Sequence, residues 1–223
     1  MNARLTSAAV AALAALAAVP AAAQVNGIAV ADPAIAVAGS QAIQTAYNQI
    51  GTTYQAQRTQ LEGLQQQRAT AIRQFDTNND GQLSQEEQTA AQANTAVMQQ
   101  VQGLDQQINT IQQPITLARV YAIEQIGLQL NTAVQQVVQA NNIQLILSPQ
   151  SALFVADAVD VTDDIITRLN TLVPTVSTAA PQGWQPAQQS VNLYQQVSEI
   201  LIAAAQQQAQ QQPAAQQPAT SGR

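Results

Sequence analysis

The sequence predicts a mainly α-helical fold with a small β part, in which a long antiparallel helical hairpin (a coiled-coil arm) projects from a small strand-rich body. Two observations lead to this prediction. Apolar residues recur at alternating steps of four and three over two long stretches, and three short β-branched runs lie outside them. Because two heptad helices joined by a short loop most simply pair with each other, the long stretches form the two sides of one arm.

The arm is expected over residues 40–140. Its first helix has polar breaks at Gln57 and Arg68 in a heptad seam formed by Ile43, Tyr47, Ile50, Tyr54, Leu61, Leu64, Ala71 and Phe75. Its second helix continues less regularly to Val137 after the seam Val97, Val101, Leu104, Ile108, Ile111 and Ile115. Pro114 should kink this second helix, because proline has no backbone N–H to donate.

The strand-rich body is expected from residues 24–39 and 141–173. Strands are predicted over 27–32, 143–147 and 152–156, and a helix should begin near Asp160 or Thr162 with acidic residues in its first turn. Three short strands and one helix are too few to bury an independent core. Several copies of the chain should therefore combine their strands in one oligomerisation body.

The two ends of the chain are expected to lie outside the arm and the body. Residues 1–23 have the features of a secretory signal peptide: Arg4, a short apolar run and a small-residue cleavage pattern. Loss of Arg4 with this segment changes the formal net charge from -6 to -7. Residues 174–205 are predicted to be a linker and a short amphipathic helix, and residues 206–223 a disordered Gln/Ala/Pro tail. Trp184 should pack on the body, or alternatively contribute to a client-binding patch.

The composition excludes several classes of function. The chain has no Cys and no His, and every basic residue is Arg. Disulfides and thiol chemistry are therefore ruled out, no catalytic constellation is visible, and we expect no enzyme activity. An acidic chain without basic clusters is poorly suited to nucleic acid, and no later segment is apolar enough for stable membrane insertion. The arm arginines are expected to be solvated or ion-paired, or alternatively to contact clients: Arg58, Arg68, Arg73 and Arg119.

Residues 76–87 have the pattern of a calcium-binding loop, D-x-N-x-D-G-x-L-S-x-x-E. Gly81 occupies the sharp turn, and the expected Ca²⁺ ligands are Asp76, Asn78, Asp80, the backbone carbonyl of Gln82, Ser84 and a bidentate Glu87. The alternative is an acidic turn that only closes the hairpin, since Asp, Asn and Gly favour turns. With a single loop present, we expect a site that stiffens the tip of the arm and not a calcium sensor.

The order of these parts resembles the Skp/OmpH family of periplasmic chaperones for outer-membrane proteins. The matching stretches are the signal peptide, "GIAVAD" (27–32), the hairpin from Ser40 to Ala140, and "NNIQLILSPQSALFVADAVDVTDDIITRLN" (141–170). The resemblance implies a periplasmic homotrimer with a small barrel-like body, whose helical arms hold unfolded outer-membrane proteins in a cavity without ATP. The chain departs from the family in having no Lys, in the calcium loop and in its C-terminal extension.

A second class of function stays open beside the chaperone. The chain would then be a calcium-binding structural or adaptor coiled-coil protein of the cell envelope. Such a protein would have defined partners and no activity towards unfolded chains.

Overall fold

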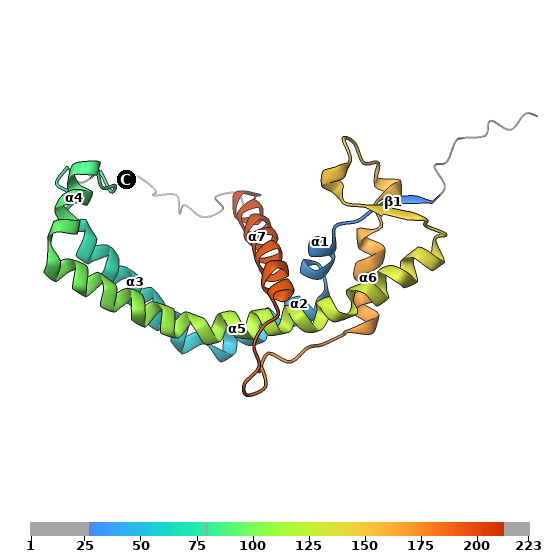
Figure 1. Cartoon of the computed structure of the whole chain (residues 1–223), viewed down its shortest axis with the longest axis horizontal. Helices are drawn as coiled ribbons and strands as arrows, with labels where there is room; N and C mark the ends of the chain where they lie inside the picture. The colour runs from blue at the N-terminus through green and yellow to red at the C-terminus, as the bar shows by residue number, and fades with distance from the viewer. Residues whose placement is uncertain (1–26, 79, 212–223) are drawn as a thin grey trace, which may run out of the picture.

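The computed structural model describes residues 27–78 and 80–211, which form seven α-helices and one two-stranded sheet (Figure 1). In chain order the elements are β1 (Ile28–Val30), α1 (Pro33–Ala38), α2 (Gln41–Thr53), α3 (Gln55–Arg73), α4 (Gln85–Ala93), α5 (Thr95–Ala140), β2 (Leu145–Leu147), the 3-10 turns η1 (Pro149–Ser151) and η2 (Asp157–Val159), α6 (Thr162–Leu172) and α7 (Gln188–Gln211). The predicted fold class, a helical arm with a small strand part, is confirmed. The predicted signal peptide and the tail beyond Gln211 lie outside the described residues.

The arm consists of α3 and α5, which run side by side from the middle of the molecule to the tip at α4 (Figure 1). The predicted seams meet there: Leu61 and Leu64 of α3 are buried against Leu104 and Ile108 of α5. Arg68, a predicted break in the seam, donates to Asp105 at 2.6 Å from a half-exposed position. Burial of apolar side chains along this seam therefore holds the two helices together, and the exposed ion pair adds little.

Two details of the arm differ from a simple pair of straight helices. The first helix is interrupted at Tyr54, whose φ of -105° and ψ of 23° leave the helical region. The preceding Gly51, Thr52 and Thr53 all have low helix propensity, which favours a break at this point. The second helix continues through Pro114 without ending, and α5 curves along its length (Figure 1).

The sheet is smaller than predicted. β1 pairs in parallel with β2, with Ile28 opposite Leu145 and Val30 opposite Leu147. On its other side Val30 forms a bridge to Asp160 and accepts a hydrogen bond from the Val161 N–H. The strand predicted over 152–156 is wrong: this segment is not a strand. Both edges of β1 are occupied, and segment 152–156 does not pair with the free outer edge of β2.

The main core lies in the body and at the root of the arm. It joins α1 and the start of α2 to the second half of α5, with α6 and α7 packed around them. Ile43, Ile123 and Ile165 are buried at its centre. A Cβ at Gly39 would lie 2.7 Å from Cδ1 of Ile166, so the end of the Ile166 side chain would have to move to admit one. The helices of one chain thus provide the core that the sequence analysis expected only from several copies.

The C-terminal segment is more ordered than the composition suggested. α7 begins at Gln188 and extends to Gln211, so the prediction of a disordered tail from residue 206 is wrong for residues 206–211. Gln and Ala are good helix formers, which explains how a low-complexity stretch continues a helix that is already anchored. The anchor is Val197, which is fully buried in the core with α1 and α5.

Candidate functional site

The predicted calcium loop connects α3 to α4 at the tip of the arm (Figure 1). Asp76 is buried, with 7% of its surface exposed, and its carboxylate organises the turn. Oδ1 accepts from the Asp80 N–H at 3.2 Å, and Oδ2 accepts from the Gly81 N–H at 2.9 Å. Gly81 has a φ of +82°, which only glycine adopts without strain. The sequence pattern therefore folds locally as a tight turn closed around its first aspartate.

The next two candidate ligands lie on the more exposed side of the same loop. The Asn78 Oδ1 accepts from the Asp80 N–H at 3.1 Å, and the Asn78 Nδ2 donates to Asp80 Oδ2 at 2.8 Å. Asp80 Oδ1 accepts from the Gln82 N–H at 2.8 Å. These side chains are thus held close together by bonds within the loop.

Glu87 closes the loop from the first turn of α4. Its Oε1 accepts from the Thr77 hydroxyl at 2.6 Å and from the Thr77 N–H at 2.7 Å, and its Oε2 accepts from the Ser84 N–H at 2.9 Å. Ser84 Oγ accepts in turn from the Glu87 N–H, which completes a capping box. These bonds, led by that from the Thr77 hydroxyl, lower the pKa of Glu87 to about 2, so it is ionised at neutral pH.

The donor set of this loop fits calcium in its chemistry. All six predicted ligands lie between Asp76 and Glu87, and they offer carboxylate, amide, carbonyl and hydroxyl oxygens of the kind that calcium prefers. Within residues 27–78 and 80–211, however, no group of three or more acidic side chains has the arrangement of a metal site. Both oxygens of Asp76 and of Glu87 are engaged by hydrogen bonds, so calcium binding stays a prediction.

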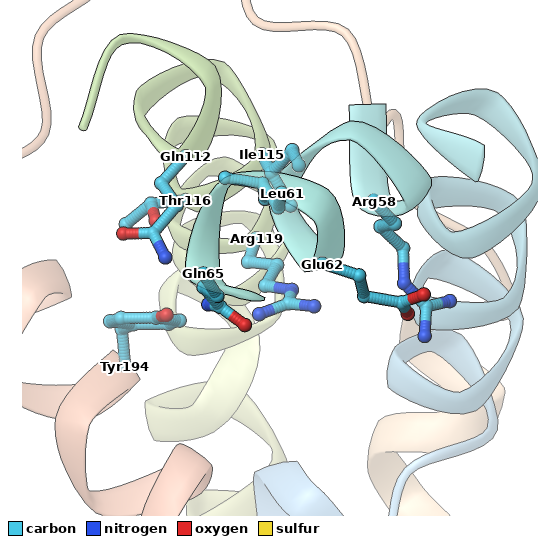
Figure 2. Close-up of a pocket in the computed structure, with 9 residues that line it drawn as sticks. All are labelled: Arg58, Leu61, Glu62, Gln65, Gln112, Ile115, Thr116, Arg119 and Tyr194. Atoms are coloured by element: carbon cyan, nitrogen blue, oxygen red, sulfur yellow. The ribbon is translucent and has the colours of Figure 1, made fainter. Parts of the chain in front are cut away.

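A cleft of about 390 Å³ lies at the root of the arm, where α7 crosses it (Figure 2). Its walls combine arginine, amide and apolar side chains from three helices: Arg58, Leu61, Glu62 and Gln65 of α3, Gln112, Ile115, Thr116 and Arg119 of α5, and Tyr194 of α7. The Arg119 guanidinium lies 5.4 Å from the centre of the Tyr47 ring, a cation–π geometry. Burial raises the pKa of Tyr47, so its hydroxyl stays protonated at neutral pH.

This cleft was not predicted from the sequence. Arg58 and Arg119 were expected to be solvated or ion-paired, or alternatively to contact clients. A partial signal was present, since Arg119 lies four residues after Ile115 and three before Ala122, on the apolar stripe of the helix. The contribution of Tyr194 has no local signal, because it depends on where α7 packs.

A second hollow of about 680 Å³ lies further along the arm between α3 and α5. Its lining is almost entirely amide and small side chains: Gly63, Gln66, Gln67, Thr70, Ala71, Gln74 and Gln100. Such a surface presents hydrogen-bond donors and acceptors without a fixed charge.

Glu124 of α5 fixes the C-terminal segment to the arm. Its carboxylate accepts from Trp184 Nε1 at 3.0 Å and from Ser190 Oγ at 2.6 Å, while the Trp184 ring packs edge-on against Tyr121. Partial burial raises the pKa of Glu124, but the bonds from Ser190 and Trp184 outweigh burial and leave this pKa below its usual value. Trp184 is therefore packed on α5, which belongs to the arm, so the prediction that it packs on the strand-rich body is wrong.

The body exposes apolar side chains on the segment that was predicted as a strand. Leu153 is fully exposed and Phe154 is 85% exposed. Ile28 of β1 and Leu145 of β2 are also more than 40% exposed. Large apolar side chains left this exposed are typical of a surface that another chain covers.

These features define a class of protein: a helical arm on a small mixed body, without a spanning helix in residues 27–78 and 80–211. Residues 27–169 match the family model described as outer membrane protein (OmpH-like), which is more than half of the chain. The chain therefore belongs to the OmpH-like family. The matched residues include the sheet, the arm and most of α6, whereas α7 lies beyond them.

Among solved structures, the chain is similar to a Caulobacter crescentus CB15 protein described as a candidate outer membrane chaperone (OmpH-like), at 20% identity. The similarity covers 68% of this chain and 88% of that one, with a TM-score of 0.42. A search of the curated proteins finds no match.

Proposed function

We propose that the protein is an ATP-independent periplasmic holdase, which binds unfolded outer-membrane proteins between its helical arms. The observation that carries the proposal is membership of the OmpH-like family across the sheet, the arm and α6. The proposal includes export by residues 1–23 and no catalytic activity. It predicts that a urea-denatured outer-membrane barrel protein, diluted into this protein, co-elutes with it on size exclusion. Elution of the client only as aggregate would contradict the proposal.

The surface of the arm supports weak and unspecific binding. The hollow between α3 and α5 is lined by amide groups and small residues, and the buried seam leaves few large apolar side chains on the outside of the arm. Amide groups can bond to any exposed backbone, so such a surface engages many sequences. Because each contact is weak, the client is released when it folds elsewhere.

The proposed working form is a homotrimer. Its support is the exposed apolar side chains of Leu153 and Phe154 on the body, together with segment 152–156, which pairs with no strand within residues 27–78 and 80–211. Strands from neighbouring copies would pair with such segments and bury these side chains. Light scattering coupled to size exclusion should give three times the mass of the mature chain, and the mass of one chain would overturn this part of the proposal.

Calcium binding at the tip of the arm is a further part of the proposal. Residues 76–87 have the motif and the glycine turn, and Glu87 is ionised at neutral pH. A bound ion would bring Asp76, Asp80 and Glu87 together without repulsion, and so would stiffen the tip. Calorimetric titration of wild type should show heat with calcium below the millimolar range, and Glu87→Gln should remove it. Absence of such heat in wild type would leave the loop as a simple turn.

The alternative function is that of a calcium-binding adaptor of the envelope. It is favoured by the C-terminal extension, since α7 lies outside the residues that match the family. Pull-down from envelope extracts separates the two functions. A broad set of unfolded barrel proteins supports the holdase, whereas one stoichiometric partner supports the adaptor.

A further inference from the structure

The cleft at the root of the arm has the composition of a binding site. It is walled by α3 and α5 on the arm and by Tyr194 of α7, a helix outside the residues that match the family (Figure 2). The C-terminal extension therefore completes a cleft that the arm alone would leave open on that side.

Positive charge is concentrated in this cleft. The chain has seven basic residues and a net charge of -6, yet Arg58 and Arg119 both line this one cleft. Among the described residues neither guanidinium forms an ion pair, since the ion pair found there joins Arg68 to Asp105. Glu62 is the one carboxylate that lines the cleft, so the lining carries a formal charge of about +1.

The fold also leaves hydrogen-bonding capacity unused beneath this cleft. Arg119 Nε is buried and has no hydrogen-bond partner within residues 27–78 and 80–211. Buried polar groups are nearly always satisfied in native proteins, so the unpaired Nε of an arginine that lines the cleft indicates that a ligand completes it. The planar guanidinium of Arg119 is suited to a carboxylate, which it can bind through two parallel bonds.

We propose that this cleft binds a short peptide segment through its carboxylate. A single formal positive charge favours a monoanion over a phosphate dianion. The apolar Leu61 and Ile115 offer contacts for an aliphatic side chain, while Gln65 and Gln112 can bond to a peptide backbone. A volume of about 390 Å³ accommodates a few residues. The proposal does not depend on chaperone activity, since it concerns the binding of short peptides to the folded protein.

The test is calorimetric titration of the full-length mature chain at low salt with three acetylated tetrapeptides. Ac-Ala-Ala-Ala-Leu has a free terminal carboxylate, Ac-Ala-Glu-Ala-Leu-amide has a side-chain carboxylate, and Ac-Ala-Gln-Ala-Leu-amide has none. The two acidic peptides differ in the source of the carboxylate, so their relative affinity shows which source the cleft accepts. At least one of them should bind, and the neutral peptide should bind about 10-fold more weakly or not at all.

Two variants of opposite sign test the charge of the cleft. Arg58 is exposed, so Arg58→Gln should leave the fold intact and lower the affinity for the acidic peptide about 3-fold. Glu62→Gln removes the competing carboxylate and should raise the affinity for the same peptide by a similar factor. Arg119→Gln should lower this affinity about 10-fold, with circular dichroism as the check on folding. The matched control is Arg168→Gln on the exposed face of α6, which should change nothing.

Three results would overturn the proposal. They are equal affinity for the neutral and acidic peptides, no heat with either acidic peptide in the millimolar range, and unchanged affinity in both Arg58→Gln and Glu62→Gln. None of these outcomes depends on whether the protein prevents aggregation, so failure here is separate from failure of the holdase proposal.

Discussion

Val197→Ala tests whether the C-terminal helix is part of the folded unit. Val197 is fully buried where α7 packs on α1 and α5. The change removes two buried carbon groups at about 0.8 kcal/mol each. A cavity term raises the expected loss in the free energy of unfolding from about 1.6 to about 2–3 kcal/mol.

The assay is urea unfolding followed by circular dichroism, with wild type and variant at one protein concentration so that self-association is matched. With a slope of about 2 kcal/mol per molar urea, the midpoint should fall by about 1 M. Fluorescence of Trp184, the one tryptophan in the chain, should change in the same transition, because Trp184 is bonded to Glu124 of the arm.

The control on the same helix is Ile202→Ala. Ile202 is 59% exposed, so this change should stay within about 0.5 kcal/mol of wild type. Two results would show that α7 is not packed on α1 and α5. They are a Val197→Ala variant as stable as wild type, and a tryptophan signal that changes at much lower urea than the helical signal.

Three further predictions concern the tip, the core and the body. The pKa of Glu87 is about 2 in the folded state and about 4.5 in the unfolded state, so the stabilisation by its bonds from Thr77 is present above pH 4.5 and is lost as the pH falls towards 2. The melting temperatures of wild type and Glu87→Gln should therefore converge over that pH interval. Melting temperatures that diverge on acidification would contradict this prediction. Gly39→Ala should cost no more than about 1 kcal/mol, because the new Cβ meets at 2.7 Å only the flexible end of the half-buried Ile166 side chain, which can change rotamer, and a much larger drop of the urea midpoint would show that Ile166 cannot move. Phe154→Asp should lower the oligomer mass measured by light scattering without reducing helicity, and an unchanged mass would remove Phe154 from the interface.

The periodic parts of the fold were predictable from the sequence. Leu61 and Leu104 recur at heptad spacing, and burial follows directly from which face of a helix an apolar residue occupies. The break at Tyr54 was not predicted, because a heptad pattern continues across a single non-helical residue. The strand predicted over 152–156 failed for a different reason: its β-branched and aromatic composition is correct for a strand, but composition does not decide pairing, and the segment does not pair with the free outer edge of β2.

One candidate site could be predicted from the sequence and the other could not. The loop from Asp76 to Glu87 was predictable because its geometry depends on residues that are close in sequence, including Gly81 at the sharp turn. The cleft at Arg119 was not, because it needs α7 to cross the arm and bring Tyr194 to it. The extent of α7 could not be predicted from composition, since a Gln- and Ala-rich segment is typical of both a disordered tail and a helix.

The most direct test of the central claim is light scattering from a urea-denatured outer-membrane barrel protein diluted into buffer, with and without this protein. No nucleotide is added, and the assay is run once with calcium and once with chelator. A holdase in several-fold molar excess should suppress the scattering, and an equal mass of a folded globular control protein should not. Scattering that rises unchanged in both conditions would contradict the holdase function.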